Sequence, residues 1–317
     1  MTPQPVPPDA VRSELPRTGM PARVEERVRG LLRAEQARCR AVDPRATGMV
    51  DALAELLAAG GERLRPTVLL TGYLAAGGEA AAAPPVDAAV ALELLDTAYL
   101  IRRDVRENAL LRQDTPTLHV RHAAEHERNG WGGDARGFGA GMAALVGELA
   151  TALADRLAAD LPEVARQLWH DLRIGRLGGS YVDSALTSRH LTDPWPAGCL
   201  AGCARSCGTG WYALQHPLMM GAALAGRGDL TVLYQDYARP LHSAWRLRGF
   251  LDGSGDRDWY GDLLREVLLG PADHLRAERT IAHLLDRTRR IAATAPVPPP
   301  WRTELAALAT HLTRPRP

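Results

Sequence analysis

The residues with the clearest chemical potential lie in the stretch LELLDTAYLIRRDVRENALLRQDTPTLH, which runs from Leu92 to His119. Its first half carries leucines and small residues at helical spacing, so we expect a buried helix there. That helix ends in Arg102, Arg103 and Arg106. Guanidinium groups bind carboxylates and phosphoryl groups through paired hydrogen bonds, so these arginines either pair with local acids or bind an anionic ligand.

Acids near these arginines support the first interpretation. Arg103 and Glu107 are four residues apart, which is the spacing of an ion pair on one helix face. Arg102 and Arg106 are also four residues apart and share another face. Asp96 lies one and a half to two turns earlier in the same helix. In this interpretation the arginines fill space and pair with neighbouring carboxylates.

Three cysteines form a second candidate cluster. Cys199, Cys203 and Cys207 recur at four-residue spacing on one predicted helix, so they line a single stripe. Such a stripe suits zinc ligation or an oligomer contact. Gly198 and Gly202 stand beside the cysteines and favour close helix packing instead.

The ten histidines show no HExxH-like spacing. His119 and His122 are therefore expected to be polar surface groups or groups that support a site, and not catalysts.

Composition narrows the functional class. The chain has 317 residues, 46% of them hydrophobic, and a formal charge of +1, which argues against a nucleic-acid partner. All 38 basic residues are arginine. No apolar run approaches about 18 to 20 residues, so we expect no membrane span. Four cysteines in a chain of this length are typical of a reducing compartment, so a cytoplasmic location is expected.

The helical pattern extends over most of the chain. Residues 1–20 are rich in proline and are expected to be a disordered tail. Residues 21–317 are expected to form a single all-α domain, because apolar residues recur at three- and four-residue spacing and no segment alternates like a strand. After the proline break in TAPVPPPW we expect one last helix.

Several segments, in unbroken order from Arg23 to Thr288, resemble the trans-type isoprenyl diphosphate synthases, or polyprenyl synthetases. GGERLRP resembles that family's GGKRLRP, and the stretch from Leu92 to His119 resembles ELxHTASLIHDDxxDxxxxRRGxPTxH. MAALVGELATALADRL resembles a helix-packing segment of the family, and GGSYVD stands where the family has GQxxD. GTGWYALQHPLMMGAALAG resembles KSGxYxxxxPLxLGAxLAG, and HSAWRLRGFLDGSGD resembles xxAFQLRDDLLxxxGD. The resemblance implies an isoprenoid synthase-type helical bundle.

The resemblance also implies a chemistry. Two carboxylates one helical turn apart, about 6 Å along the axis, share Mg²⁺ ions that hold an allylic diphosphate and make it a leaving group. In this sequence the first DDxxD motif is RDVRE: Arg103 stands at the first Asp, Asp104 is kept, and Glu107 replaces the last Asp.

The second acidic motif is altered more strongly. Gly249 and Phe250 replace its leading acids, Asp252 remains nearby, and Arg246 stands at the family's Gln. A divalent ion 4 Å from an arginine is repelled by about 8 kcal/mol at an effective dielectric constant of 20. We therefore expect no cofactor and regard the usual magnesium cluster as improbable, with Asp104, Glu107 and Asp252 as the residual catalytic or metal candidates.

The groups that hold diphosphates in the family are only partly kept. Arg65, Arg112 and Thr209 match family positions. Glu62, Gln113 and Gly208 replace basic residues. In the second interpretation of the arginines, guanidinium groups bind an isoprenyl diphosphate directly in place of Mg²⁺, together with Arg248. The candidate diphosphate-binding residues are Arg65, Arg103, Arg106, Arg112, Thr209 and Arg246. Tyr99 stands where bulky residues shorten the family's hydrocarbon tunnel.

Three functional hypotheses follow. The leading one is a non-catalytic or regulatory subunit that forms a homodimer, or a heterodimer with an active prenyl diphosphate synthase. The alternative is a diverged terpene synthase or prenyltransferase that acts on an allylic C10 to C15 diphosphate through an arginine-lined pocket. The third is an isoprenoid-binding protein whose proline-rich tail docks elsewhere.

Overall fold

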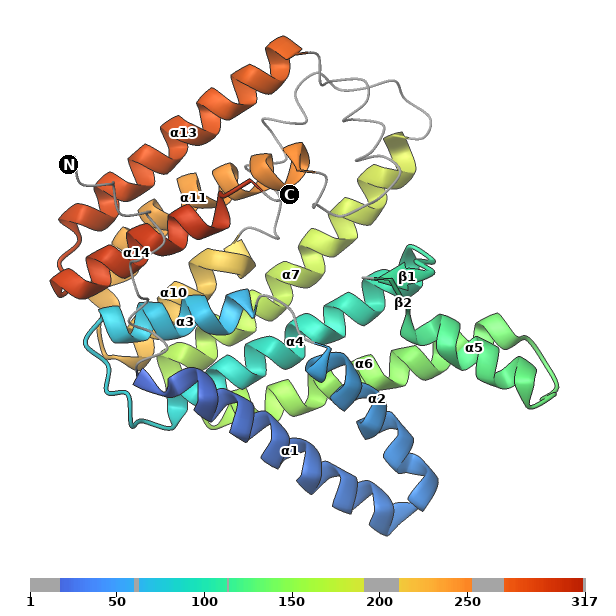
Figure 1. The fold of residues 1–317 in the computed structure, drawn as a ribbon. Helices are drawn as coiled ribbons and strands as arrows, with labels where there is room; N and C mark the ends of the chain where they lie inside the picture. Colours follow the sequence, from blue (N-terminus) through green and yellow to red (C-terminus); the bar gives the residue numbers. More distant parts are fainter. Residues whose placement is uncertain (1–17, 60–62, 113, 191–210, 253–270, 316–317) are drawn as a thin grey trace, which may run out of the picture. The chain divides into compact units, whose positions relative to one another are not determined.

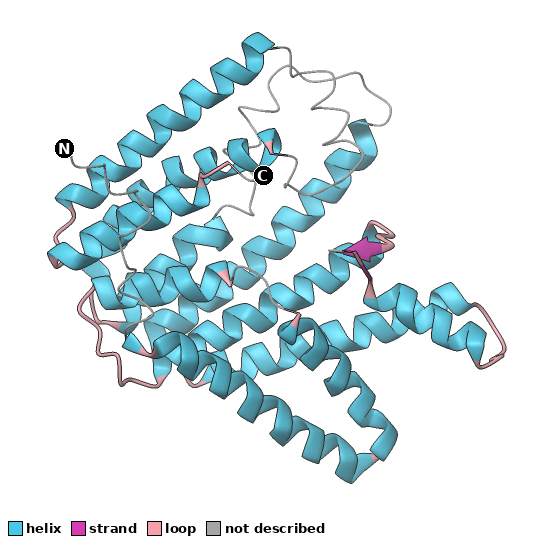
Figure 2. Ribbon diagram, in the orientation of Figure 1, coloured by secondary structure: helices cyan, strands magenta, loops and turns pink. Residues whose placement is uncertain are grey.

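The computed structural model describes residues 18–59, 63–112, 114–190, 211–252 and 271–315. Helices make up nearly all of this part of the chain (Figures 1 and 2), which confirms the all-α prediction. The longer helices are α1 (Met20–Val42), α2 (Thr47–Ala58), α3 (Leu64–Ala75), α4 (Pro84–Arg106), α5 (Leu118–Arg128), α6 (Ala135–Ala159), α7 (Glu163–His190), α10 (His216–Leu224), α11 (Thr231–Leu251), α13 (Pro271–Thr294) and α14 (Pro299–Leu312). Short helical turns are η3 (Pro44–Ala46), η4 (Trp211–Gln215) and η5 (Gly228–Leu230).

The chain divides into two compact units. We call residues 21–66 and 83–161 the N-terminal unit, which holds nearly all of α1, α2, α4, α5 and α6. The remainder, residues 1–20, 67–82 and 162–317, is the C-terminal unit. Whether the two units make one domain, as the sequence suggested, stays a prediction.

Helix α4 is the core helix of the N-terminal unit. It begins at Pro84 and Pro85, whose fixed φ suits the first turn of a helix. It ends at Arg106, and Asn108 directly afterwards has a φ of 50°, a left-handed conformation that stops helices. The buried side chains of α4 lie on nearly all of its faces. They include Val90, Leu94, Leu95, Ala98 and Ile101.

Helix α6 holds the N-terminal unit together, because α4, α5 and α2 all pack against it. At Gly139 of α6 a Cβ atom would lie 2.2 Å from the carbonyl oxygen of His119 and 2.9 Å from the backbone nitrogen of Ala123. Backbone meets backbone at this crossing of α5 and α6, so only glycine fits.

By length and composition alone, α6 is also the one helix of the described ranges that is apolar enough to cross a membrane. Core helices of soluble proteins share that composition, and α6 packs against α4 and α5. Its composition therefore does not indicate a span.

In the C-terminal unit, helix α11 connects the other helices. The hydroxyl of Tyr234 donates a hydrogen bond of 2.8 Å to the carbonyl of Gly72 in α3. The hydroxyl of Tyr237 donates one of 2.7 Å to the carbonyl of Leu305 in α14. Helix α13 packs against both α11 and α14, and α14 confirms the predicted last helix.

Two features differ from the sequence-based expectation. A short antiparallel ladder, β1 (Leu111–Arg112) with β2 (Thr115–Pro116), follows α4 although no strand was predicted. Helix α1 begins at Met20, which was assigned to the disordered tail and whose side chain is buried. The rest of that tail, residues 1–17, lies outside the described residues, as do Glu62, Gln113, Thr209, Gly208 and the cysteines Cys199, Cys203 and Cys207.

Candidate functional site

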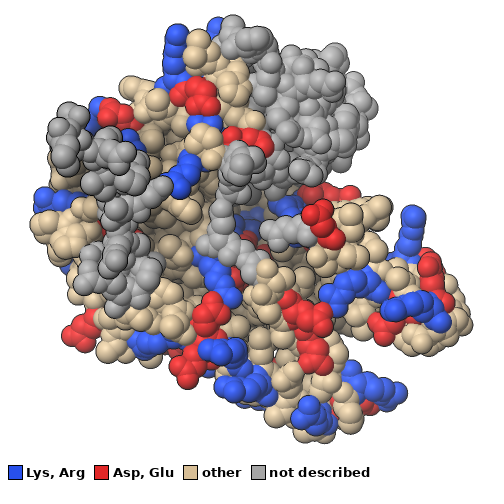
Figure 3. Space-filling view, viewed as in Figure 1, with Lys and Arg blue, Asp and Glu red and all other residues tan. Residues whose placement is uncertain are grey.

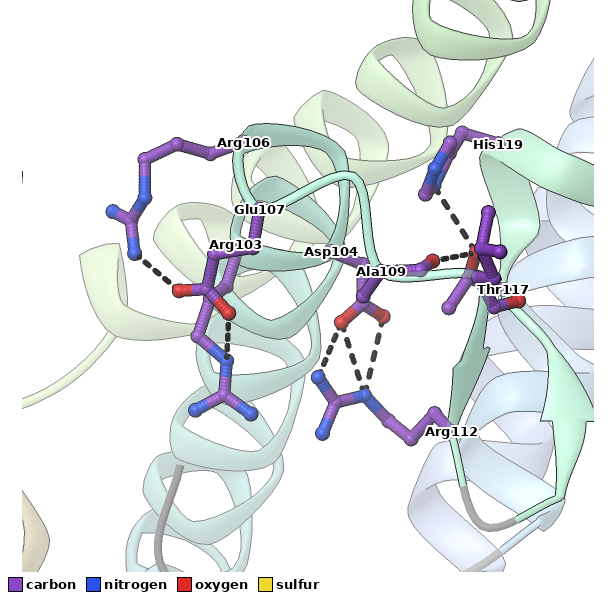
Figure 4. A network of polar contacts seen from close by, with 9 residues as sticks. Arg103, Asp104, Arg106, Glu107, Ala109, Arg112, Thr117 and His119 are labelled. Carbon is purple, nitrogen blue, oxygen red and sulfur yellow. Dashed lines mark hydrogen bonds and ion pairs between the residues drawn. The ribbon is translucent and has the colours of Figure 1, made fainter. Parts of the chain in front are cut away.

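The end of α4 brings together most of the residues that the sequence singled out (Figure 4). Asp104 is buried, with 10% of its side chain exposed, whereas Arg106 on the other side of the helix is 43% exposed. Residues two apart in a helix face roughly opposite directions, so one turn divides these groups between the core and the surface.

Asp104 is bound by Arg112 from the hairpin. The Nε atom of Arg112 donates to both carboxylate oxygens, at 3.0 and 3.2 Å, and its Nη2 donates to Oδ1. Arg112 pairs with Thr115 in the ladder, and Asp114, just before Thr115, adopts a left-handed φ of 61°, as residues in tight hairpin turns often do. The arginine and the aspartate that match positions of the resembling family's motif are therefore paired with each other.

A second set of hydrogen bonds fixes the hairpin against α4 and α5 (Figure 4). The hydroxyl of Thr117 donates to the carbonyl of Ala109 at 2.6 Å, and the amide of Ala109 donates to the carbonyl of Asp104 at 2.9 Å. Because the Thr117 hydroxyl donates there, it accepts from Nδ1 of His119 at 3.2 Å. His119 is buried, so it is not the surface group that was one of the two expectations, and a supporting role stays a prediction.

Three further arginines, Arg102, Arg103 and Arg106, lie at the same helix end. Arg106 donates to Glu107 at 2.9 Å, and Nε of Arg103 lies 3.8 Å from the other oxygen of Glu107. Arg102 donates to the hydroxyl of Thr151 in α6 at 2.8 Å and lies 5.2 Å from the ring centre of Tyr99. The predicted pair of Arg103 with Glu107 is present, and Glu107 is shared by two guanidinium groups.

The donor set at this helix end does not fit magnesium, which takes oxygen ligands at about 2.0 to 2.1 Å in octahedral geometry. Both oxygens of Asp104 accept from Arg112, and both oxygens of Glu107 face arginines. A divalent cation would have to displace guanidinium groups and would then lie beside them. Across residues 18–59, 63–112, 114–190, 211–252 and 271–315, no group of three or more His, Cys, Asp or Glu side chains could hold a metal ion.

Arg65, at the start of α3, lies in the same unit but has a different partner. Its Nη1 forms an ion pair with Asp96, two turns before the arginines of α4. Glu93 lies one turn earlier still, and burial, reinforced by the charge of Asp96, raises the pKa of its carboxyl group. Sequence reasoning missed Asp96 as a partner of Arg65.

The second motif lies on α11 of the C-terminal unit, and there the expectation for Arg248 was wrong. Arg248 is buried and donates to both oxygens of Glu278 in α13, each at 2.7 Å. It also donates to the carbonyl of Thr313 at 3.0 Å, and Asp252 lies 3.6 Å away. Burial requires this compensation, so Arg248 is part of the core and not of a ligand pocket.

The neighbouring residues of α11 include one exposed and one buried basic group. Arg246 is exposed. His242, one turn earlier, is buried, and its Nε2 atom has no hydrogen-bond partner among the described residues. Burial, with a smaller effect from Arg246, lowers the pKa of His242 to about 4. His242 is therefore neutral at physiological pH.

Several solved prenyl diphosphate synthases share this fold. A geranylgeranyl pyrophosphate synthase from Corynebacterium glutamicum, in complex with isoprenyl diphosphate and magnesium, is 23% identical with a TM-score of 0.78, over 94% of this chain and 99% of that chain. A decaprenyl diphosphate synthase from Rhodobacter capsulatus is 17% identical with a TM-score of 0.65, over 94% and 98%. A polyprenyl synthase from Caulobacter crescentus, in complex with calcium and isoprenyl diphosphate, is 20% identical with a TM-score of 0.63, over 96% and 99%. No family model matches the chain. The chain has the all-α fold of the trans-prenyl diphosphate synthases.

Proposed function

We propose that this protein is a cytoplasmic subunit of isoprenoid biosynthesis that binds an isoprenyl diphosphate through arginines, does not elongate it, and pairs with an active prenyl diphosphate synthase. The observation that carries the proposal is that the partly exposed arginines Arg103 and Arg106 lie beside the carboxylate of Glu107. The helix end thus carries exposed guanidinium groups where the resembling family carries acids. The ligand is taken from the solved structures of this fold, two of which contain isoprenyl diphosphate.

The geometry suits direct binding of a diphosphate. The side chains of Arg103 and Arg106 are 26% and 43% exposed, so a ligand reaches them without unfolding the helix. The separation of 3.8 Å between Nε of Arg103 and the carboxylate of Glu107 is that of an ion pair without a hydrogen bond. Each guanidinium group then donates two hydrogen bonds to the diphosphate, as arginine does in phosphate sites generally.

The contacts of the remaining acids argue against chain elongation. Ionisation of an allylic diphosphate in the resembling family needs metal ions at both acidic motifs, whereas here Asp104 is paired with Arg112 and Asp252 lies beside Arg248. We propose that the bound diphosphate is held intact. The ligand then regulates or stabilises the subunit and is not a substrate for condensation.

The proposed pairing uses the outward face of α6. Gly137, Gly141, Ala144, Leu145 and Ala152 are exposed on α6, and Glu148 is exposed among them. A helix with small and apolar exposed residues can pack closely against a partner. Charged side chains of both signs are interleaved over the described part of the surface seen in Figure 3, in keeping with the formal charge of +1. A homodimer alone, or a heterodimer with an active synthase, would cover the α6 face.

One observation favours the alternative, a terpene synthase or prenyltransferase. Tyr99 is buried one turn before the arginines, and the guanidinium of Arg102 lies over its ring. An aromatic ring at this depth limits the length of a hydrocarbon chain whose diphosphate is bound by Arg103 and Arg106. This arrangement suits C10 to C15 ligands, which are also the substrates of such enzymes.

Three measurements test the proposal. Inorganic pyrophosphate in EDTA should raise the melting temperature, because a ligand at a hundredfold excess over Kd stabilises the folded state by about 2.7 kcal/mol. The double variant Arg103→Gln, Arg106→Gln should lose the shift. A matched control, Arg45→Gln with Arg227→Gln, removes the same charge from two exposed arginines that pair with local aspartates and should keep it.

Measurements of enzymatic activity and of the molecular mass in solution complete the test. With Mg²⁺, isopentenyl diphosphate and C5 to C15 allylic diphosphates, the purified protein should form no longer prenyl diphosphate. Efficient elongation would overturn the proposal, and a cyclised or prenylated product would select the alternative. A monomeric mass that does not change when an active synthase is added would contradict the pairing.

A further inference from the structure

Helix α1 of the N-terminal unit carries an excess of basic charge on its exposed side. Residues 27–46, which run from α1 to the end of η3, contain six arginines and two acids, a formal charge of +4 in a chain whose total is +1. All six arginines are exposed, whereas Glu35, one of the two acids, is buried. The surface of this segment is therefore mostly positive.

Three of these arginines form a stripe along α1, which we call the basic stripe: Arg29, Arg33 and Arg40. They are four and seven residues apart, so their side chains lie on the same side of the helix over about 16 Å. Arg29 donates to a carbonyl of its own helix, that of Glu25, at 3.4 Å. Within the described ranges, no acid forms an ion pair with any arginine of the basic stripe.

An apolar corner follows the basic stripe directly. Helix α1 ends at Val42, and the chain turns through η3 into α2 (Figure 1). The Val42 residue is 86% exposed, and Ala41 and Pro44 are exposed beside it in the sequence. We call these three residues the apex. Arg45, which follows the apex, forms an ion pair of 2.6 Å with Asp43. The apex therefore presents apolar side chains to the surroundings between charged groups.

Stabilisation of the fold accounts for only part of this charge. Arg40 lies in the last turn of α1, where a cation stabilises the negative end of the helix dipole. That effect is confined to the last turn, so it does not extend to Arg29 and Arg33. Asp51, an exposed acid of α2, is hydrogen-bonded to Gln36 at 2.6 Å. Most of the basic stripe is thus available to a partner outside the chain.

We infer that the basic stripe and the apex attach this protein, peripherally and reversibly, to the surface of an anionic lipid bilayer. The guanidinium groups bind the phosphates of anionic headgroups, and the Val42 side chain enters the boundary between headgroups and acyl chains. Nucleic acids also offer phosphates, but a duplex backbone has no apolar layer that would take up the apex. The inference goes beyond the proposed function and does not depend on it, because no isoprenyl diphosphate takes part in the attachment.

Co-sedimentation with extruded vesicles tests the inference. The full chain should bind vesicles made from an equimolar mixture of phosphatidylcholine and phosphatidylglycerol, and it should not bind vesicles of phosphatidylcholine alone. Binding should be lost in concentrated salt, because the screening length falls from about 10 Å at 0.1 M to about 3 Å at 1 M. Binding to both kinds of vesicle alike would overturn the inference.

Substitutions in the basic stripe locate the contact. The triple variant with glutamine at all three positions should lower the partition coefficient about 100-fold, since each arginine near an anionic surface contributes about fivefold. The triple variant with lysine keeps the charge and should bind like the wild type. The matched control replaces three exposed arginines of the C-terminal unit with glutamine and should also bind like the wild type; these are Arg239, Arg279 and Arg287.

A substitution at the apex tests the apolar part of the contact. Val42→Asp should weaken binding on the order of 10-fold, because it removes an apolar group and adds a charge that the anionic surface repels. Val232→Asp is the control, because Val232 is 65% exposed in the C-terminal unit and lies outside the proposed surface. Equal effects of the two substitutions would overturn the role of the apex and with it the choice of a bilayer.

The remaining outcomes separate a bilayer from other anions. Full binding by the glutamine variant of the basic stripe would overturn the inference, and so would tighter binding of a DNA duplex than of the anionic vesicles. Arg103→Gln with Arg106→Gln should bind vesicles like the wild type. Loss of vesicle binding in that double variant would place the lipid phosphates at the end of α4 and overturn the inference. Failure of the pyrophosphate measurements would contradict the proposed function and would leave the vesicle results unchanged.

Discussion

Arginines lie near both positions where the resembling family carries acidic motifs, and the two units hold them differently. In the C-terminal unit Arg248 is buried and donates to both oxygens of Glu278. In the N-terminal unit Arg103 and Arg106 remain partly exposed and share Glu107. A buried charge has to be compensated by the protein itself, whereas an exposed charge can take its counter-ion from water or from a ligand. The first arginine therefore stabilises the fold, and the other two are accessible to a diphosphate.

The largest expected effect is the loss of stability when the buried arginine, Arg248, is replaced. Arg248→Gln removes the partner of Glu278 and of the Thr313 carbonyl, and it should lower the free energy of unfolding by about 3 kcal/mol. Urea denaturation measures the loss. Arg246→Gln, two residues earlier on the exposed side of α11, is the control and should change stability by less than about 0.5 kcal/mol. Equal losses of stability for Arg248→Gln and Arg246→Gln would contradict the distinction between buried and exposed arginines.

The next effect concerns His242 and pH. The pKa of His242 is lowered from 6.5 in the unfolded chain to about 4 in the folded protein, so the unfolded state binds the proton first as the pH falls. The stability contributed by the neutral ring is complete above pH 6.5 and is lost as the pH falls from 6.5 toward 4. Between pH 7 and pH 5 the loss should be about 2 kcal/mol. The difference in unfolding free energy between wild type and His242→Asn should shrink accordingly, and a difference independent of pH would contradict the assignment.

Arg112 is an intermediate case, because it is partly exposed but its partner Asp104 is buried. Arg112→Gln should cost about 1 to 2 kcal/mol, since the carboxylate loses its charged donors inside the protein. Thermal unfolding at neutral pH provides the measurement. Arg121→Gln, which breaks the more exposed pair with Glu55, should cost less than about 1 kcal/mol. A larger loss of stability for Arg121→Gln than for Arg112→Gln would show that burial of the acid does not determine the loss.

The smallest expected effect is the stability change of Arg103→Gln with Arg106→Gln. Partly exposed ion pairs contribute less than about 1 kcal/mol, and the double variant also relieves repulsion between two like charges. Differential scanning fluorimetry without ligand should therefore give a melting temperature close to that of the wild type. A loss of more than about 2 kcal/mol would support the first interpretation from the sequence, in which these arginines only fill the cavity.

Sequence periodicity was sufficient to predict α1, α2, α4, α6 and α7, because apolar residues recur at helical spacing in these segments. The pair of Arg103 with Glu107 was predictable for the same reason, since residues four apart are neighbours on any helix. Local geometry therefore accounts for the part of the site that lies within one helix.

The rest of the site depends on contacts between distant residues. The pairs of Arg65 with Asp96 and of Arg248 with Glu278 join residues that are 31 and 30 positions apart. Nothing in the spacing of a sequence reports such a contact. Arg248 was assigned to the ligand pocket together with Arg246, but residues two apart on a helix face roughly opposite directions, and only packing against α13 decides which one is buried.

The contact of Gly139 with α5 has a consequence for motion. Because backbone atoms touch there, α5 cannot slide along α6 or turn about its axis without separating from it. Thr117, at the start of α5, is hydrogen-bonded to Ala109 just after α4, so α4, α5 and α6 form a rigid frame around the helix end. Access of a ligand then depends on rotamer changes of Arg103, Arg106 and Glu107. Such changes take picoseconds to nanoseconds for exposed side chains, so association should be limited by diffusion and orientation and not by slow opening of the backbone.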